Sequence, residues 1–238
     1  MKKHIPNTLT CLNLVCGCLS CMAALKSNLE AASMWIVASA VFDFFDGFAA
    51  RMLKVSSPIG KELDSLSDVV SFGVAPAMIT YTWLTRCFFE IPPAHQTPFM
   101  EMMPFIVLLV PALSAVRLAN FNIDDRQSTN FIGLPTPANA LFLGFIPAAA
   151  EKIAILSNFW VVWFLTLALA ILLVSNINMM SLKFKTLKLT NENIPRYILL
   201  FIGLVLLIFF QQGAFPLIIL TYLLISLIYH SLIKLQVL

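Results

Sequence analysis

Eight apolar segments divide almost the whole chain, and they constrain its fold more than any other feature. Most approach the roughly 20 residues that a helix needs to cross a bilayer. A segment inside lipid must satisfy its own backbone hydrogen bonds, so each is predicted to be helical. The fifth is short and bounded by prolines. The segments cover residues 8–25, 31–52, 63–85, 99–121, 135–150, 158–181, 195–211 and 214–234.

The composition excludes the common soluble classes. Sixty per cent of the residues are hydrophobic and 11% are charged, whereas a soluble domain carries roughly 25% charged residues. Disorder is excluded by the same comparison. The net charge of +3 is too small to indicate nucleic-acid binding. We therefore expect an all-α integral membrane protein in which residues 1–238 form one transmembrane domain of about eight helices.

The beginning of the chain resembles a secretory signal only in part. Lys2 and Lys3 precede an apolar run, but Asn13 interrupts that run and no clean small-residue cleavage site follows. We therefore expect the first helix to be retained.

The distribution of basic residues predicts the orientation in the membrane. With the N-terminus inside and the helices alternating, both termini and the loop near 53–62 are cytoplasmic. Three basic residues then lie outside: Lys26, Arg86 and Lys152. Twelve lie inside: Lys2, Lys3, Arg51, Lys54, Lys61, Arg117, Arg126, Lys183, Lys185, Lys188, Arg196 and Lys234.

Four carboxylates gather at this one cytoplasmic loop. The chain has six Asp, and Asp43, Asp46, Asp64 and Asp68 are four of them. The first two are three residues apart and the last two are four apart, so each pair shares a helical face. The loop makes the two helices antiparallel, and the two faces can therefore converge. Ionisable residues inside membrane segments are costly and usually functional.

The acid cluster is predicted to bind divalent cations. Unneutralised, four close carboxylates would repel one another. Two hard cations would balance them, and the absence of His and Cys nearby favours Mg²⁺ or Mn²⁺ over zinc. The small residues Gly47 and Gly60 leave room for a bulky ligand, and Arg51 is placed to meet a phosphate. The alternative is an interfacial network in which the acids pair with Lys and Arg.

The spacing of these residues resembles the CDP-alcohol phosphotransferase signature, D-x-x-D-G-x-x-A-R-x8-G-x-x-x-D-x-x-x-D. All eight fixed positions agree, from Asp43 to Asp68. The resemblance implies a six-helix core over about 4–185, two further helices over about 195–234, and homodimers, which are common in that family. It also implies two metal ions, a CDP-linked lipid as donor and CMP as product.

The resemblance assigns roles by motif position. Asp43, Asp46, Asp64 and Asp68 would bind the metals, and Asp68 would act as general base. Arg51 would assist the nucleotide phosphates and so belong to the catalytic set. The CDP-lipid would contact six positions: Asn7, Gly47, Ala50, Arg51, Gly60 and Lys61.

Segments outside the signature resemble the membrane-embedded bacterial phosphatidylserine synthases, a branch of that family. They include Ile5–Thr8, Asp68–Ala77, Arg117–Asn122 and Phe131–Ala138. This resemblance implies transfer of the phosphatidyl group of CDP-diacylglycerol to L-serine at the cytoplasmic side of the bacterial inner membrane. Asn120 stands where such sequences often have Arg, which weakens an anion-binding role there.

Acceptor recognition lies outside the signature. Arg117 is expected to bind the serine carboxylate, with Asn122 close by, although Arg117 is also explained as a positive-inside anchor. Two rival functions stay open. Another family member would accept glycerol 3-phosphate or inositol, and a cation transporter would carry its acids at mid-bilayer on broken helices.

Overall fold

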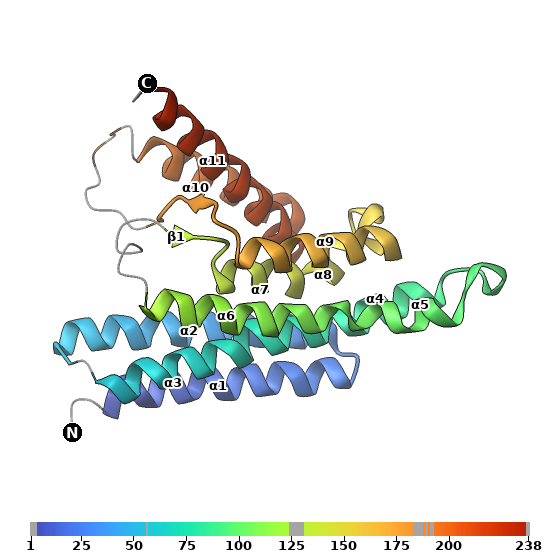
Figure 1. Ribbon diagram of the computed structural model, residues 1–238, viewed down its shortest axis with the longest axis horizontal. Coiled ribbons are helices and arrows are strands. Elements are labelled where there is room, and N and C mark those ends of the chain that lie inside the picture. The colour runs from blue at the N-terminus through green and yellow to red at the C-terminus, as the bar shows by residue number, and fades with distance from the viewer. Residues whose placement is uncertain are drawn as a thin grey trace.

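A computed structural model describes residues 4–55, 57–123, 131–182, 188, 190 and 193–236, without the side chains of Phe131 and residues 232–236. The described chain is a bundle of helices with one pair of two-residue strands (Figure 1). Its long apolar helices identify an integral membrane protein, which confirms the predicted class. Three helical stretches, His4–Leu25, Pro98–Ile123 and Ile194–Ser231, have the length and apolarity to cross a membrane.

The first three helical segments carry the acidic residues. Helix α1 spans His4–Leu25 and α2 spans Leu29–Leu53. A continuous helix follows, made of α3 (Pro58–Asp68), a π-helical segment η1 (Val69–Val74) and α4 (Ala75–Phe89). Helix α3 begins where the Ser57 hydroxyl accepts from the Gly60 amide, with Pro58 in its first turn.

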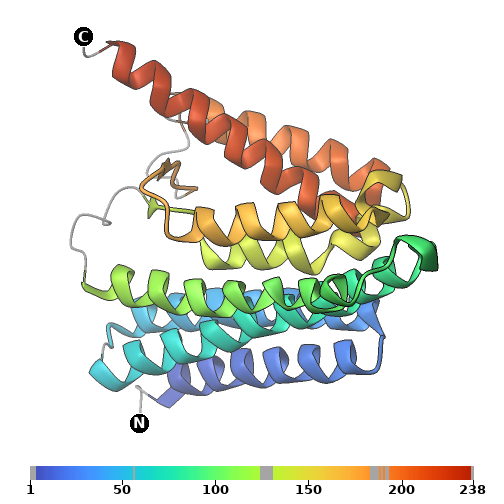
Figure 2. The same ribbon diagram turned by 45° about the vertical axis from the view of Figure 1, so that its right-hand side comes forward.

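The remaining elements complete the bundle. They are η2 (Pro93–His95), α5 (Pro98–Met102), η3 (Met103–Leu108), α6 (Leu109–Ile123), β1 (Phe131–Ile132), α7 (Thr136–Gly144), α8 (Ile146–Ala150), η5 (Ala154–Ser157), α9 (Phe159–Leu173), β2 (Asn178–Met179), α10 (Ile194–Phe210), η6 (Gln211–Gly213) and α11 (Ala214–Gln236). Figures 1 and 2 show α7 to α9 lying between the group formed by α1 to α6 and the hairpin of α10 and α11.

All eight predicted segments contain helix, but two differ from the prediction in detail. The fifth is broken at Phe145, because Pro147 lacks the N–H that would continue the helix. The sixth ends at Leu173, so the predicted helix is wrong for 174–181. There the chain extends, and β2 pairs antiparallel with β1 while the Gly133 amide donates to the Ile177 carbonyl at 2.9 Å.

Several sequence predictions lie outside the described residues. They concern the end of the core near residue 185, and Lys2, Lys3, Arg126, Lys183 and Lys185 of the orientation argument.

Large apolar side chains pack inside the bundle and also cover its outside. Phe72, Ile36 and Ile79 are fully buried where α1, α2 and α4 meet. A second buried cluster joins α4, α6, α7 and α9 around Phe142 and Leu143. Large apolar residues such as Phe164, Phe201 and Ile208 are exposed on the outside of the bundle, as expected for a surface that contacts lipid.

Candidate active site

Three carboxylates converge between the second half of α2 and the second half of α3. Between the helices, Lys54 adopts a left-handed conformation (φ 52°) and its amide donates to carbonyls of the last turn of α2. This turn lays α3 antiparallel to α2. Asp43, Asp64 and Asp68 each present a carboxylate oxygen within 4.8 Å of the others. The predicted convergence of the two acidic faces is therefore present.

The fourth acid lies beside this triad. Asp46 is buried, and its Oδ2 accepts a 2.6 Å hydrogen bond from the Thr10 hydroxyl on α1. It lines a cavity together with Asp64. The four acids thus form a triad and one adjacent carboxylate, which a hydroxyl group of α1 holds in place.

Helix α1 also forms a hydrogen bond with Asp68, the residue predicted to act as general base. The Asn13 amide donates to Asp68 Oδ1 at 3.2 Å, and the Asn13 carbonyl accepts from the Ser71 hydroxyl at 3.0 Å. The Ser67 hydroxyl donates to the Thr10 carbonyl at 3.0 Å. Thr10 and Asn13 were missing from the predicted site residues. The sequence signal that could have identified them is that two polar residues lie three positions apart within an apolar segment.

A close approach between α1 and η1 accompanies these bonds. A Cβ added at Gly17 would lie 2.8 Å from Ser71 Cα, a separation that real side chains do not show. Glycine at this position therefore lets α1 approach η1 closely enough for Ser71 to reach the Asn13 carbonyl.

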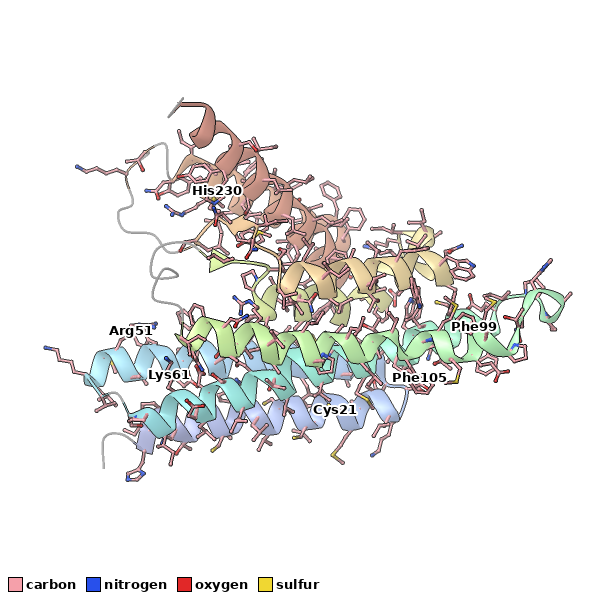
Figure 3. All side chains as sticks on the ribbon, viewed as in Figure 1. Cys21, Arg51, Lys61, Phe99, Phe105 and His230 are labelled. Carbon is pink, nitrogen blue, oxygen red and sulfur yellow. The ribbon has the colours of Figure 1, made fainter. Side chains whose placement is uncertain are left out.

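A cavity of about 560 Å³ opens beside the acids. Its lining includes six predicted nucleotide-binding residues, Asn7, Gly47, Ala50, Arg51, Gly60 and Lys61, along with Asp46 and Asp64. Figure 3 shows Arg51 and Lys61 at the same end of the bundle, on α2 and α3.

Two glycines leave the cavity open. A Cβ at Gly47 would meet Arg51 Nη1 at 3.3 Å, so the guanidinium lies across this glycine. A Cβ at Gly60 would meet Ser57 Oγ at 3.0 Å and Asn7 Oδ1 at 3.2 Å. Both positions are crowded by polar atoms that face the cavity.

Lys61 and Asn122 join α3 to α6. The Lys61 ammonium donates to the Asn122 carbonyl at 2.7 Å, and the Asn122 amide donates to Ser65 Oγ at 2.7 Å. The structure therefore places Asn122 beside α3 and commits its amide nitrogen to Ser65.

Arg117 lies in the interior, close to the acids. It is 7% exposed, and its Nη1 donates to Thr136 Oγ1 at 3.4 Å. Its guanidinium lies 5.9 Å from the ring centre of Phe121 and within electrostatic range of Asp68 and Tyr222. The positive-inside explanation alone does not account for a buried arginine next to the acid cluster.

The donor set fits a hard divalent cation. Carboxylate oxygens are the ligands that Mg²⁺ and Mn²⁺ prefer, and the triad offers three of them within 4.8 Å. None of the four acids forms an ion pair with a lysine or arginine in the part of the chain that the structure describes.

Comparisons with known proteins agree with this geometry. The model of the CDP-alcohol phosphatidyltransferase family matches residues 3–174. The chain is 36% identical over 135 residues to a CDP-diacylglycerol–serine O-phosphatidyltransferase of Bacillus subtilis, covering 57% of this chain and 70% of that protein. It is 33% identical over 203 residues to an enzyme of the same name from Helicobacter pylori J99, covering 84% of this chain and 79% of that protein.

A third relative of that name, from Mycobacterium leprae, is 34% identical over 186 residues, covering 74% of this chain and 57% of that protein. The matched family region contains all four acids, the cavity residues and Arg117. The family predicted from the signature is thereby confirmed, and the chain belongs to the CDP-alcohol phosphatidyltransferases.

Proposed function

We propose that this chain transfers the phosphatidyl group of CDP-diacylglycerol to the hydroxyl of L-serine and releases CMP. The observation that carries the proposal is the carboxylate triad beside an open cavity, in a chain whose curated relatives are named for this reaction. The reaction breaks the bond between the phosphatidyl phosphorus and the CMP oxygen. It forms a bond from that phosphorus to the serine oxygen.

Asp43, Asp64 and Asp68 would hold a divalent cation, Mg²⁺ or Mn²⁺, and Asp46 would help to hold a second. Bound cations would neutralise the diphosphate and stabilise the departing CMP. The hydrogen bond from Thr10 fixes Asp46, and the bond from Asn13 fixes Asp68. This chain therefore supplies preorganised oxygen ligands from two antiparallel helices.

The cavity would receive the CDP moiety. Gly47, Ala50 and Gly60 leave space for it, and Asn7 offers a polar contact on the α1 side. Arg51 would interact with the nucleotide phosphates, and Lys61 would add positive charge at the rim. The acyl chains would stay in the bilayer along the apolar outer surface.

Asp68 would accept the proton of the serine hydroxyl, which is otherwise a weak nucleophile at neutral pH. Arg117 would bind the serine carboxylate, because it is buried, cationic and within electrostatic range of Asp68. Asn122 would contribute from the neighbouring turn of α6. Its link to Ser65 supports a role in positioning α6 as well.

The site would face the cytoplasm of a bacterial inner membrane, with both termini on that side. The supporting argument is the excess of Lys and Arg at the ends that carry the acids. The described start of α1, the described end of α11 and the α2–α3 turn lie at one end of the bundle (Figure 1). A homodimer is proposed from the family resemblance.

The test uses the purified full chain in detergent with CDP-diacylglycerol and Mn²⁺ or Mg²⁺. L-Serine, glycerol 3-phosphate and inositol are offered separately, and CMP release is followed. Release with serine alone supports the proposal. Release with another acceptor would keep the mechanism and overturn the choice of serine, whereas failure to bind CDP would reopen the transporter hypothesis.

A further inference from the structure

Four buried polar atoms on α6 and α7 have no hydrogen-bond partner in the described part of the chain. They are Ser114 Oγ, Arg117 Nε and both amide atoms of Asn139. Ser114 and Asn139 are fully buried. An unsatisfied buried polar group costs about 1–3 kcal/mol, and native structures rarely leave several together. These atoms therefore indicate a ligand or water that the protein binds here.

The two helices bring these side chains together. Arg117 on α6 meets Thr136 on α7 through their hydrogen bond. Because the helices are antiparallel, moving three residues inward on each leads from Arg117 to Ser114 and from Thr136 to Asn139. Each is about 4.5 Å deeper in the bundle. Ser114 and Asn139 thus each lie about one turn beneath the Arg117–Thr136 contact, and both helices also contact η1.

Other groups of the protein lie above, below and beside Ser114 and Asn139. Above them, Arg117 is within electrostatic range of Asp68. Below them, Val110 and Leu143 belong to one fully buried apolar cluster. Beside them, a Cβ on Gly73 would lie 3.3 Å from Ser114 Cβ, so η1 packs tightly there. The unsatisfied atoms thus lie between the apolar core and the predicted base.

The chemistry of the four atoms fits a zwitterion. The Asn139 amide offers a carbonyl oxygen to an ammonium group and N–H donors to a carboxylate. The Arg117 Nε–H adds a charge-assisted donor for the carboxylate, and the Ser114 hydroxyl can accept from the ammonium. A phosphorylated acceptor would need more cationic side chains than Arg117 alone supplies beside these atoms. An uncharged polyol would offer no carboxylate to the Arg117 Nε–H.

We propose that Asn139 and Ser114, together with Arg117, bind the ammonium and carboxylate groups of the acceptor amino acid and thereby determine its specificity. This inference rests on the proposed function, because it takes the acceptor to be serine. With its charged groups held between α6 and α7, the serine hydroxyl is directed toward Asp68. Asn139 and Ser114 lie outside the signature and were absent from the sequence-based predictions.

The test compares Asn139→Leu and Ser114→Ala with a matched control. Thr85→Val is the control, since Thr85 Oγ1 on α4 is also buried without a partner. Loss of a hydrogen bond to a charged group corresponds to about 10- to 100-fold in affinity. We expect Asn139→Leu to raise the KM for L-serine by that factor and Ser114→Ala by about threefold to tenfold. In both variants the KM for CDP-diacylglycerol should stay within about twofold of the parent value. In Thr85→Val, the KM values for L-serine and for CDP-diacylglycerol should both stay within that range.

A second readout separates recognition from folding. Ethanolamine lacks the carboxylate, so the preference of the enzyme for L-serine over ethanolamine is expected to fall in Asn139→Leu, which removes donors to the carboxylate. The preference is expected to stay unchanged in Ser114→Ala, because both acceptors carry the ammonium group. An unchanged serine KM in either variant, or an unchanged preference in Asn139→Leu, with CDP binding intact, would overturn the inference and leave a structural water as the ligand. If the unmodified protein binds CDP but does not use serine, the proposed function itself fails.

Discussion

The acid-bearing helices and the C-terminal hairpin are held to their neighbours by different forces. Around α1 to α3, contacts between helices include directional hydrogen bonds between side chains, such as Thr10 to Asp46 and Asn13 to Asp68. The hairpin of α10 and α11 presents large apolar side chains outward, with Phe201 and Ile208 more than 60% exposed. Hydrogen bonds between side chains of different helices thus gather around the acids, whereas much of the hairpin surface is apolar and exposed.

The hairpin is nevertheless tied to the interior at one place. The Tyr222 hydroxyl donates to the Met180 carbonyl at 2.9 Å, and the Met180 amide donates to Ser226 Oγ at 3.3 Å. The Arg196 guanidinium donates to the Ser181 carbonyl at 2.8 Å. Through these bonds the last two helices, which carry no family motif, hold the extended strand that follows α9.

The largest effect is expected at the acid cluster itself. Asp68→Asn keeps the size of the side chain and the neighbouring helix contacts but removes the base and one anionic ligand. Removal of a general base typically costs about 10²- to 10⁴-fold. We expect CMP release to fall by at least about 10³-fold while thermal unfolding in detergent stays near that of the parent. Activity within tenfold of the parent would contradict the role of Asp68.

A smaller loss is expected when the hydrogen bond from α1 is removed. Asn13→Leu deletes the donor to Asp68 Oδ1 with little change in volume. A hydrogen bond to a charged group contributes about 1.5–3 kcal/mol, so the rate of CMP release should fall about 10- to 100-fold. As the control, Asn158→Leu removes an exposed cap of α9 and should leave the rate unchanged. Equal rates for both variants would show that α1 does not position Asp68.

Matched glycine substitutions compare the two regions directly. Gly17→Ala places a Cβ 2.8 Å from the Ser71 backbone, whereas Gly203→Ala on α10 meets only Ile218 at 3.9 Å. Overpacking costs about 1–3 kcal/mol, and alanine otherwise favours helix by about 1 kcal/mol. We expect Gly17→Ala to lower the midpoint of thermal unfolding and Gly203→Ala to leave it equal or higher. The reverse order would mean that the hairpin is the more tightly packed region.

The smallest effect is expected at the tie between α11 and the strand. Tyr222→Phe removes one buried hydrogen bond, which contributes about 1 kcal/mol to stability. Denaturation of the detergent-solubilised protein should show a loss of that size, and CMP release should change by less than about fivefold. A Thr221→Val variant provides the comparison, because the Thr221 hydroxyl bonds only within its own helix. A change of tenfold or more in Tyr222→Phe would assign α11 a direct role in the reaction.

The sequence predicts the acid cluster because its residues are close together along the chain. Asp43 to Asp68 span one helix–turn–helix, so their periodicity and the loop between them determine how they meet. Thr10 and Asn13 could not be assigned in this way, since their partners are 36 and 55 residues away. The same holds for Asn139, because only the folded structure shows that both atoms of its amide are buried without a partner.

The course of the chain after α9 could not be predicted from hydropathy. Residues 174–181 mix apolar residues with Ser175, Asn176, Asn178 and Ser181, and Asn178 and Met179 pair with β1 next to Gly133, which has a φ of 77°. A Cβ at Gly133 would meet the Ser175 carbonyl at 3.1 Å. This tertiary contact replaces helix, and its partner, more than 40 residues earlier in the chain, cannot be identified from the local sequence.

The π-helical segment Val69–Val74 gives one continuous helix two angular phases. Each π-type bond spans five residues instead of four, so residues after η1 are rotated relative to those before it. Asp64 and Asp68 can therefore face the acid cluster while Ile79 and Leu84, farther along the same rod, face the core. Removing a single residue from this segment would turn one set away from its partners by about 100°. The acidic face and the packing face of this span are thus set by one local irregularity in an otherwise regular helix.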